Sequence, residues 1–524
     1  MIYLLSQTIE ASASRYPDSA AFICGKRSVT YQELLEQTNQ LANLLIERGV
    51  QKGDRVGVYL NRSLETAIAI YGIMRAGAVY VPLDPNSPTQ RTQFLINDCN
   101  IGHLITNPAQ QRTLQPVVAD ETALHTVVGL KADWPVYTLA WLEVFDRPAD
   151  QMPQVRILEK DPAYLMYTSG STGVPKGILH THQSGLGYAR LSADLYDLTS
   201  EDRVGNHAPL HFDISTFGYF SAPLVGATTV IVPDAHTKMP VSLAQLIEKE
   251  RLTIWYSVPL ALIQLLQQGQ LEGHDMTSLR WVLFGGEPFP AHHLKELMEL
   301  WHHCQFSNVY GPAEVNQCTY YHVPKPPEPG TSIPLGQVWN NTEMLIHNEQ
   351  EEAVQQGEIG ELLIRSITRM SGYWKQPELT QQSLYKRIAA TGNDEVFYRT
   401  GDLVQLDSDG NLLFMGRKDR QIKLRGFRIE LDEVTNVLLG HPQVEEAAVF
   451  TGKNGSGETV LKAAIIPKQN ATLTANAVRL FMEQKMARYA LPEEVDLTDT
   501  LPRTPNGKIN LKQLEEKGLN LAQK

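Results

Sequence analysis

Strand-like and helix-like segments alternate over most of residues 1–418, and this alternation restricts the fold more than any other feature of the sequence. The apolar run at 55–60 precedes a helical pattern at 63–75, and the run at 228–232 precedes another at 241–251. Alternation of this kind is typical of parallel or mixed β-sheets that are covered by helices. We therefore predict an α/β fold.

The sequence divides naturally near Asp419. With 524 residues, the chain is too long for one ordinary hydrophobic core. The residues after Asp419 have their own alternation, with a strand-like run at 444–451 and a helical pattern at 476–486. We predict a large N-terminal domain of residues 1–418 and a small α+β C-terminal domain of residues 419–524.

The composition argues against several classes of partner. Apolar residues make up 42% of the chain and charged residues 20%, which is typical of a globular protein. The formal net charge of −12 gives no basic surface for a nucleic acid. No apolar run is long enough to span a membrane, and the N-terminus has no signal-peptide pattern. The four cysteines form no Cys-x-x-Cys pair, so we expect a cytoplasmic protein that contacts neither nucleic acid nor membrane.

A loop rich in glycine and hydroxyl groups follows an apolar run at 164–167, and it reads Thr168-Ser-Gly-Ser-Thr172-Gly-Val-Pro-Lys176-Gly177. The backbone N–H groups and hydroxyls of such a loop can bind phosphate oxygens, and its glycines let the main chain come close. It is not a Walker A loop, because that motif has serine or threonine after the lysine and here Gly177 follows Lys176. We predict that this loop binds the phosphates of a nucleotide.

This loop resembles the phosphate loop of the adenylate-forming enzymes, which include acyl-CoA synthetases, luciferases and amino-acid adenylation domains. The resemblance covers nearly the whole chain. Further motifs of the family recur in the family's order at 28–34, 75–85, 308–314, 360–362, 372–380, 398–403, 416–426 and 502–508. The resemblance implies a large N-terminal domain that includes a β-barrel-like subdomain, and a mobile C-terminal lid domain that is hinged at Asp419.

The reaction that the resemblance implies is attack of a carboxylate on the α-phosphorus of ATP, which gives an acyl-adenylate and pyrophosphate. Charge grows on the phosphate oxygens in the transition state, so cations are needed there. The matching motifs give Lys508 as the catalytic cation, Glu314 as a ligand of Mg²⁺ and Thr168 as a phosphate-facing hydroxyl. The family usually has threonine where this chain has Ala313, so one hydroxyl near the phosphates is missing.

The other nucleotide-binding residues are implied by the same motifs. Tyr310 is expected to stack on adenine, Asp402 to accept hydrogen bonds from both ribose hydroxyls, and Arg417 to approach the ribose or a phosphate. The remaining predicted nucleotide contacts are Ser169, Gly170, Ser171, Thr172, Gly173, Lys176, Gly285, Gly286, Glu287 and Asn308.

Asp213 is the strongest indication of the substrate class. In the amino-acid-activating branch of the family, an aspartate at this position pairs with the α-ammonium group of the substrate, and fatty-acyl and aryl ligases usually lack it. A buried carboxylate without a partner would be costly. The residues that match the family's substrate pocket are Asp213, Ile214, Phe217, Tyr256, Leu283, Gly285, Val309, Gln317 and Cys318. They form a mostly apolar set with no second charge, which favours a small aliphatic or cyclic amino acid.

The pocket set resembles that of free-standing L-proline:carrier-protein ligases, and L-proline is the leading prediction. The alternatives are the same chemistry with isoleucine, valine or D-alanine and, against the indication of Asp213, an acyl- or aryl-CoA ligase. A non-enzymatic nucleotide sensor would be expected to lack Lys508 or Glu314. The sequence has no Leu-Gly-Gly-x-Ser attachment motif, so we expect a separate carrier protein to accept the aminoacyl group on its phosphopantetheine thiol.

Overall fold

The computed structural model describes residues 1–119, 122–170, 175–389, 392–455, 457–504 and 509–517. The chain forms two compact units. The first comprises Met1–Pro85, Ile96–Met166 and Gly177–Lys418, and the second comprises Asn86–Leu95, Tyr167–Lys176 and Asp419–Lys524. The second unit therefore combines the C-terminal segment with two short segments from earlier in the chain.

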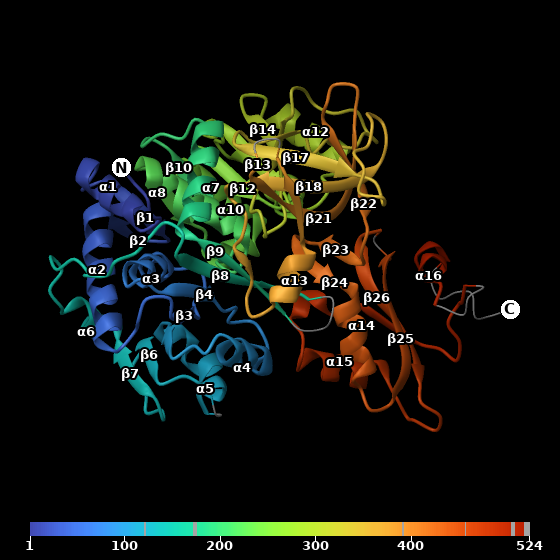
Figure 1. Ribbon diagram of the computed structural model, residues 1–524, viewed down its shortest axis with the longest axis horizontal. Coiled ribbons are helices and arrows are strands. Elements are labelled where there is room, and N and C mark those ends of the chain that lie inside the picture. The colour runs from blue at the N-terminus through green and yellow to red at the C-terminus, as the bar shows by residue number, and fades with distance from the viewer. Residues whose placement is uncertain (120–121, 171–174, 390–391, 456, 505–508, 518–524) are drawn as a thin grey trace. The chain divides into compact units, whose positions relative to one another are not determined.

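The largest sheet lies in the first unit, and its strands follow the order β16-β15-β14-β13-β12-β10-β11-β1-β2 (Figure 1). The central strands, from β14 to β1, run parallel, and β2, β15 and β16 pair antiparallel at the two sides. The strands are β1 (Ala20–Cys24), β2 (Arg27–Thr30), β10 (Arg203–Asn206), β11 (Thr228–Ile231), β12 (Ile254–Ser257), β13 (Trp281–Gly285), β14 (Gln305–Tyr310), β15 (Thr319–His322) and β16 (Gln337–Val338). Central parallel strands are covered on both faces, which explains why β13 is apolar and buried at every position.

A second sheet has the order β19-β9-β8-β4-β3-β5-β6-β7. Strands β3 to β8 run parallel in it, and β19 pairs antiparallel with β9. The strands are β3 (Arg55–Val58), β4 (Val79–Pro82), β5 (His103–Ile105), β6 (Thr126–Gly129), β7 (Tyr137–Ala140), β8 (Pro162–Thr168), β9 (Lys176–Thr181) and β19 (Gly372–Tyr373). These two sheets and the helices between their strands confirm the predicted α/β class.

Helices occupy most of the connections between these strands (Figure 1). They are α1 (Gln7–Arg15), α2 (Tyr31–Glu47), α3 (Leu64–Arg75), α4 (Thr89–Asp98), α5 (Gln111–Ala119), α6 (Trp141–Phe145), α7 (His182–Leu195), α8 (Ala222–Val225), α9 (Asp234–Thr237), α10 (Pro240–Lys249), α11 (Pro259–Gln268), α12 (Ala291–Leu300) and α13 (Pro377–Gln382).

The sequence of helix α2 determines where the helix begins and how it packs. The hydroxyl of Thr30 accepts from the Glu33 N–H and the Glu33 carboxylate accepts from the Thr30 N–H, a capping box that fixes the first turn. The helix then packs on α3, whose residues are buried along almost the whole length. A Cβ on Gly72 would lie 2.6 Å from Cδ2 of Leu41, so the close contact between the two helices requires glycine.

A third sheet in the first unit has the order β17-β18-β21-β20, with β22 beside β21, and all of these pairs are antiparallel. The strands are β17 (Thr342–His347), β18 (Gly360–Ser366), β20 (Leu384–Ile388), β21 (Asp394–Leu406) and β22 (Leu412–Arg417). The β-barrel-like subdomain was expected in this region. Among the described residues the strands form an open sheet and do not close into a barrel, although a register shift between Leu403 and Val404 adds local twist.

The second unit is small and has α+β character. Its strands form a hairpin of β23 (Gln421–Leu424) with β24 (Phe427–Glu430) and a separate sheet of β25 (Val444–Lys453), β26 (Thr459–Pro467) and β27 (Glu494–Leu497). Its helices are α14 (Leu431–Leu439), α15 (Ala475–Glu483) and α16 (Leu511–Lys517). The core includes Val434, Leu438, Val449 and Val478. Arg425 and Gly426 both have positive φ, as the tight turn between β23 and β24 requires.

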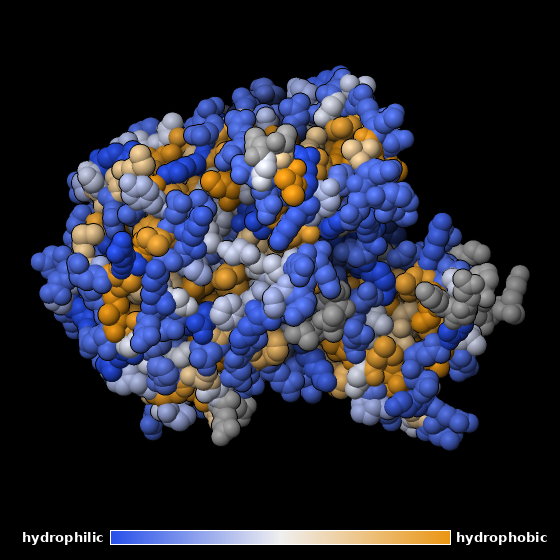
Figure 2. Space-filling model, viewed as in Figure 1, coloured by the Kyte–Doolittle hydropathy of each residue, from blue (hydrophilic) through white to orange (hydrophobic). Residues whose placement is uncertain are grey.

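The surface is predominantly hydrophilic. Figure 2 shows one face on which apolar groups are scattered among polar ones, and an exposed apolar residue by itself is normal for a folded protein. Within the described ranges, no helix has both the length and the apolar character that crossing a membrane requires.

Candidate functional site

The predicted substrate pocket lies at one edge of the largest sheet. Tyr256 pairs with Leu283 across β12 and β13, and Gly285 pairs with Val309 across β13 and β14. Three of these four residues stand in the second half of their strands, and Leu283 is the middle residue of β13. The carboxyl ends of neighbouring parallel strands meet at the same edge of a sheet, where ligands bind in open α/β folds. The sheet topology therefore brings together residues that are far apart in the sequence.

Apolar side chains fill the space beside these strand ends. Phe217, Tyr256, Leu283 and Val309 belong to one buried cluster, against which Ile214 packs. The ring of Phe217, from the short helix η3 (Phe217–Ser221), meets that of Tyr256 edge to face with centroids 5.8 Å apart. The structure thus places five of the predicted pocket residues in contact around a common apolar centre.

Asp213 stands close to this cluster, at the first residue of the 3-10 turn η2 (Asp213–Ser215). Its Oδ1 accepts a hydrogen bond of 2.9 Å from the Ile214 N–H. Burial raises the pKa of Tyr256 well above its usual value, and the negative charge of Asp213 raises that pKa further. A carboxylate therefore acts electrostatically on one side of the apolar cluster.

Gly285 and Cys318 differ in how they relate to the cluster. A Cβ on Gly285 would lie 2.1 Å from the backbone oxygen of Val309, so the close approach of the two strands requires glycine. Cys318, by contrast, packs in a neighbouring cluster with Tyr310 and Tyr373, and its Sγ lies 3.6 Å from the Tyr310 oxygen. The structure does not place Cys318 in the apolar cluster of the other predicted pocket residues.

Three of the predicted nucleotide residues meet around Asp402. The Tyr310 hydroxyl donates to its Oδ2, and the Arg417 guanidinium donates to its Oδ1. Asp402 and Arg417 are also cross-strand partners in β21 and β22. Burial raises the pKa of Tyr310 well above its usual value, and the adjacent Asp402 charge adds to the shift, so the phenol keeps its proton and remains a donor.

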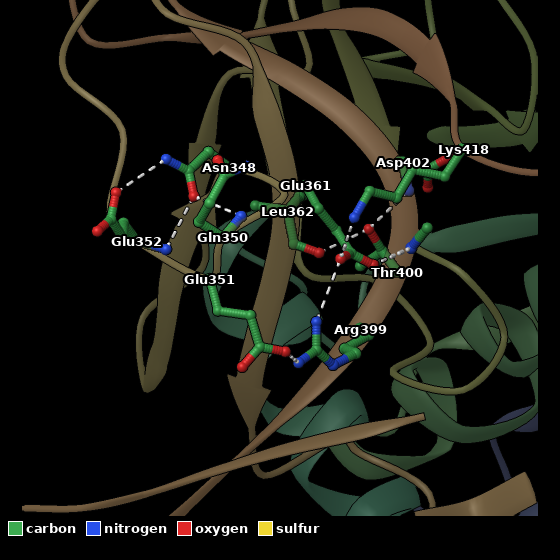
Figure 3. Close-up of polar contacts among 11 residues, drawn as sticks. Asn348, Gln350, Glu351, Glu352, Glu361, Leu362, Arg399, Thr400, Asp402 and Lys418 are labelled. Carbon is green, nitrogen blue, oxygen red and sulfur yellow. Dashed lines mark hydrogen bonds and ion pairs between the residues drawn. The ribbon is translucent and has the colours of Figure 1, made fainter. Parts of the chain in front are cut away.

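A second carboxylate holds the strand segment that carries Asp402 (Figure 3). Glu361 of β18 is almost fully buried, and it accepts from Lys418 Nζ at 3.0 Å and from the Gly401 N–H at 3.3 Å. Its Oε2 also pairs with Arg399 at 3.4 Å, and Arg399 reaches Glu351 with its other nitrogen. Sequence motifs identified Glu361 only as part of a Gly-Glu-Leu segment. Nothing in the sequence indicated these contacts, because the burial of Glu361 follows from the pairing of β18 with β21.

Glu314 is fully buried next to the nucleotide residues. Its Oε1 accepts a 2.8 Å hydrogen bond from the Tyr373 hydroxyl, and its backbone oxygen accepts from Met370 N at 2.7 Å. The preceding residue, Ala313, offers its carbonyl to His180 Nε2 at 2.9 Å. Burial lowers the pKa of His180 to about 4, so the ring is neutral at pH 7 and Nε2 carries the proton that this bond needs.

The turn after β13 is held by its own contacts. Gly286 has a φ of +95°, and Glu287 Oε1 accepts from the Leu260 N–H at the start of α11. Asn308 donates from Nδ2 to the Pro334 oxygen at 2.7 Å. These bonds hold Glu287 and Asn308, two of the predicted nucleotide contacts, in place.

The phosphate loop is described in part. Ser169 donates from Oγ to the Arg428 oxygen at 2.9 Å, Lys176 Nζ lies 3.3 Å from Glu430 Oε1, and the Gly170 N–H bonds to the Glu433 carboxylate. Thr168 Oγ1 is buried without a hydrogen-bond partner among the described residues, as a hydroxyl reserved for a ligand would be. Ser171, Thr172, Gly173 and Lys508 lie outside the described residues.

The comparisons with known proteins identify the family of the chain. The AMP-binding enzyme family matches residues 9–374, and the AMP-binding enzyme C-terminal domain matches residues 433–508. An L-proline--[L-prolyl-carrier protein] ligase from Pseudomonas fluorescens is 32% identical over 97% of this chain and 98% of its own length. A ligase of the same name from Streptomyces coelicolor is 33% identical over 96% of this chain and 94% of its own.

A solved structure of an adenylation domain has a fold similar to that of this chain. An adenylation domain from Vibrio cholerae, in complex with glycyl-adenosine-5'-phosphate, is 25% identical with a TM-score of 0.83, and the match covers 99% of this chain and 98% of that one. The chain belongs to the AMP-binding enzyme family, as its motifs predicted. It is therefore an ATP-dependent ligase.

Proposed function

We propose that the protein activates an L-amino acid, with L-proline as the first candidate, and transfers it to a separate carrier protein. The observation that carries the proposal is the carboxylate of Asp213 beside a compact apolar cluster. A carboxylate there suits the ammonium group of an amino acid, and the apolar walls suit a small side chain or ring. The full-length similarity to two ligases named for L-proline supports this choice.

In the first step, an oxygen of the substrate carboxylate attacks the α-phosphorus of ATP. The bond from that phosphorus to the oxygen bridging it to the β-phosphorus breaks, and pyrophosphate leaves. No covalent enzyme intermediate is needed, so the protein contributes position and charge. Asp402 would accept hydrogen bonds from the ribose hydroxyls, and its contacts with Tyr310 and Arg417 hold its two oxygens in place.

Glu314 and Lys508 are the residues proposed for the charge that develops in this step. A single buried carboxylate fits Mg²⁺, because this ion is commonly held by one or two carboxylates together with substrate phosphates. No group of three or more potential metal ligands occurs in the part of the chain that the structure describes, which agrees with that mode. When bound, Mg²⁺ would neutralise phosphate charge. Lys508 would bridge the substrate carboxylate and the α-phosphate.

The second step is proposed to be transfer to phosphopantetheine. The thiolate attacks the carbonyl carbon of the aminoacyl-adenylate, a thioester forms and AMP leaves. We propose that Asp419 is the hinge on which residues 419–524 turn between the two steps, as the resemblance to the adenylate-forming enzymes implies.

Amino-acid-dependent exchange of pyrophosphate into ATP tests the first step, with the twenty amino acids, D-alanine and pipecolate as substrates. We expect the strongest exchange with L-proline, and a fall of about 100-fold in kcat/KM for the amino acid in Asp213→Asn, because the charge partner of the ammonium is lost. Strong exchange with isoleucine or valine would keep the chemistry and replace the substrate. Exchange with an aryl or fatty acid alone would contradict the proposal.

A further inference from the structure

Gln317 carries a polar atom that the protein leaves without a partner. The residue is 5% exposed, and its Nε2 donates to the hydroxyl of Tyr256. Its Oε1 is buried and has no hydrogen-bond partner among the described residues. A buried acceptor that no group satisfies is unfavourable, so such atoms in folded proteins call for an explanation.

The amide that carries this atom is held by Tyr256, a residue of the predicted substrate pocket. The Tyr256 hydroxyl that holds the Gln317 amide is 3.7 Å from the position that a Cβ on Gly285 would take, and the Tyr256 ring packs on Phe217. The side chains of Phe217, Leu283 and Val309 in the apolar cluster have no hydrogen-bonding atom with which to satisfy it. The amide of Gln317 therefore stands as a buried polar group close to apolar side chains that cannot bind it.

Turning the amide over exchanges its oxygen and its nitrogen but leaves one of them unpaired. In one orientation the site offers an acceptor, and in the other it offers a donor. A hydroxyl group can donate and accept, so it satisfies Gln317 in both orientations. An ammonium group, which only donates, and a plain methylene group do not have this property.

We propose that Gln317 selects an amino acid whose side chain or ring carries a hydroxyl, such as a hydroxylated proline or threonine. This inference rests on the proposed function, because it concerns the same pocket and the same reaction. It refines the substrate class. L-proline and valine leave one polar atom of the Gln317 amide without a hydrogen bond, whereas the hydroxyl of their hydroxylated counterparts would supply that bond. Sites that hydrogen-bond a substrate hydroxyl discriminate against the analogue that lacks it.

The test compares substrates in matched pairs that differ by a hydroxyl. The kcat/KM for pyrophosphate exchange is measured with L-proline against the cis and trans isomers of 4-hydroxy-L-proline and trans-3-hydroxy-L-proline, and with L-valine against L-threonine. In the native protein we expect at least one hydroxylated member to exceed its parent by at least about tenfold.

The variant Gln317→Leu has a similar volume and no polar atom, and we expect it to reverse that preference. Because the ratio is taken within one protein, partial loss of folding cancels from it. Tyr256→Phe, which removes the described partner of the amide, should reduce the preference without reversing it. The native preference together with its reversal in Gln317→Leu would support the proposal.

Two results would overturn the inference while the proposed function stands. One is exchange in which each parent amino acid equals or exceeds its hydroxylated members. The other is a preference for the hydroxyl that Gln317→Leu leaves unchanged. Absence of exchange with every amino acid would overturn the proposed function and, with it, this inference.

Discussion

The two halves of the candidate site are built in opposite ways. Around the predicted substrate, Phe217, Leu283 and Val309 form a buried apolar wall with few polar atoms. Around the predicted ribose, Asp402 and Glu361 anchor a network of hydrogen bonds and ion pairs. An apolar wall selects by shape, and it separates neighbouring substrates by only about 1–3 kcal/mol per methylene. A charged network fixes orientation, which suits a nucleotide whose structure does not vary.

The largest expected effect is at Asp402. Asp402→Asn removes the negative charge that pairs with Arg417, whose side chain is only 13% exposed. We expect kcat/KM for ATP to fall by about 100-fold or more, with little change in the preference among amino acids. Pyrophosphate exchange at varied ATP concentration measures this. Asp409→Asn, at an exposed position in the turn between β21 and β22, is the control. A change of less than about threefold would contradict the role given to Asp402.

Glu361→Gln tests whether the network is also needed for stability. The glutamine keeps one acceptor oxygen but loses the charge that pairs with Lys418 and Arg399. We expect the free energy of unfolding to fall by about 1–3 kcal/mol, and the KM for ATP to rise. Denaturant unfolding measures the first and exchange kinetics the second. The exposed Glu349→Gln is the matched control. Equal stability of the two variants would show that the buried contacts of Glu361 contribute nothing.

Gly285→Ala tests the apolar half of the candidate site. The added Cβ would lie 2.1 Å from a backbone oxygen, which cannot rotate away as a side chain can, so the strands must shift. We expect a loss of about 1–3 kcal/mol in stability and a rise in the KM for the amino acid that exceeds the rise for ATP. Gly273→Ala is the control, because nothing lies within 4 Å of its added Cβ. Equal effects on the two Michaelis constants would mean that the two halves are not separate.

The last expected effect is on the pH dependence of stability, and it concerns His180, which joins the strand after the phosphate loop to the carbonyl before Glu314. Burial lowers its pKa to about 4 in the folded protein, while the unfolded chain has the ordinary value of about 6.5. Between these values only the unfolded chain binds the proton, so stability falls as the pH drops from about 6.5 to 4. His180→Gln should reduce this slope by one proton, about 1.4 kcal/mol per pH unit. The free energy of unfolding, measured between about pH 4 and 6.5, tests this prediction. The exposed His302→Gln is the control. An unchanged slope in His180→Gln would contradict the role given to His180.

Much of the substrate side could be predicted from the sequence. Phe217, Tyr256, Leu283 and Val309 were expected in one pocket, and the structure places them in one cluster because neighbouring parallel strands end at the same edge. Cys318 was expected there too, but it packs beside Tyr310. Cys318 comes directly before β15, and its Sγ lies 3.6 Å from the backbone oxygen of Tyr310.

The network around Asp402 was less visible in the sequence. Glu361, Arg399 and Lys418 are far apart along the chain, and none of them is unusual in type or spacing. They meet because β18 pairs with β21 and because β22 returns beside β21. The pairing partner of a strand depends on the whole sheet, and a local pattern of residues does not encode it.

Local properties of the sequence, its strand-helix periodicity and its ordered motifs, were enough to predict the class of fold and the enzyme family. The tertiary structure alone decided which carboxylates are buried together, which glycine must remain glycine and which atom of Gln317 is left without a partner. These depend on contacts between residues distant in the chain. Packing in three dimensions determines which groups are buried and which hydrogen bonds they make. Burial in turn determines how strongly the charged groups interact, and packing determines the shape of the pocket.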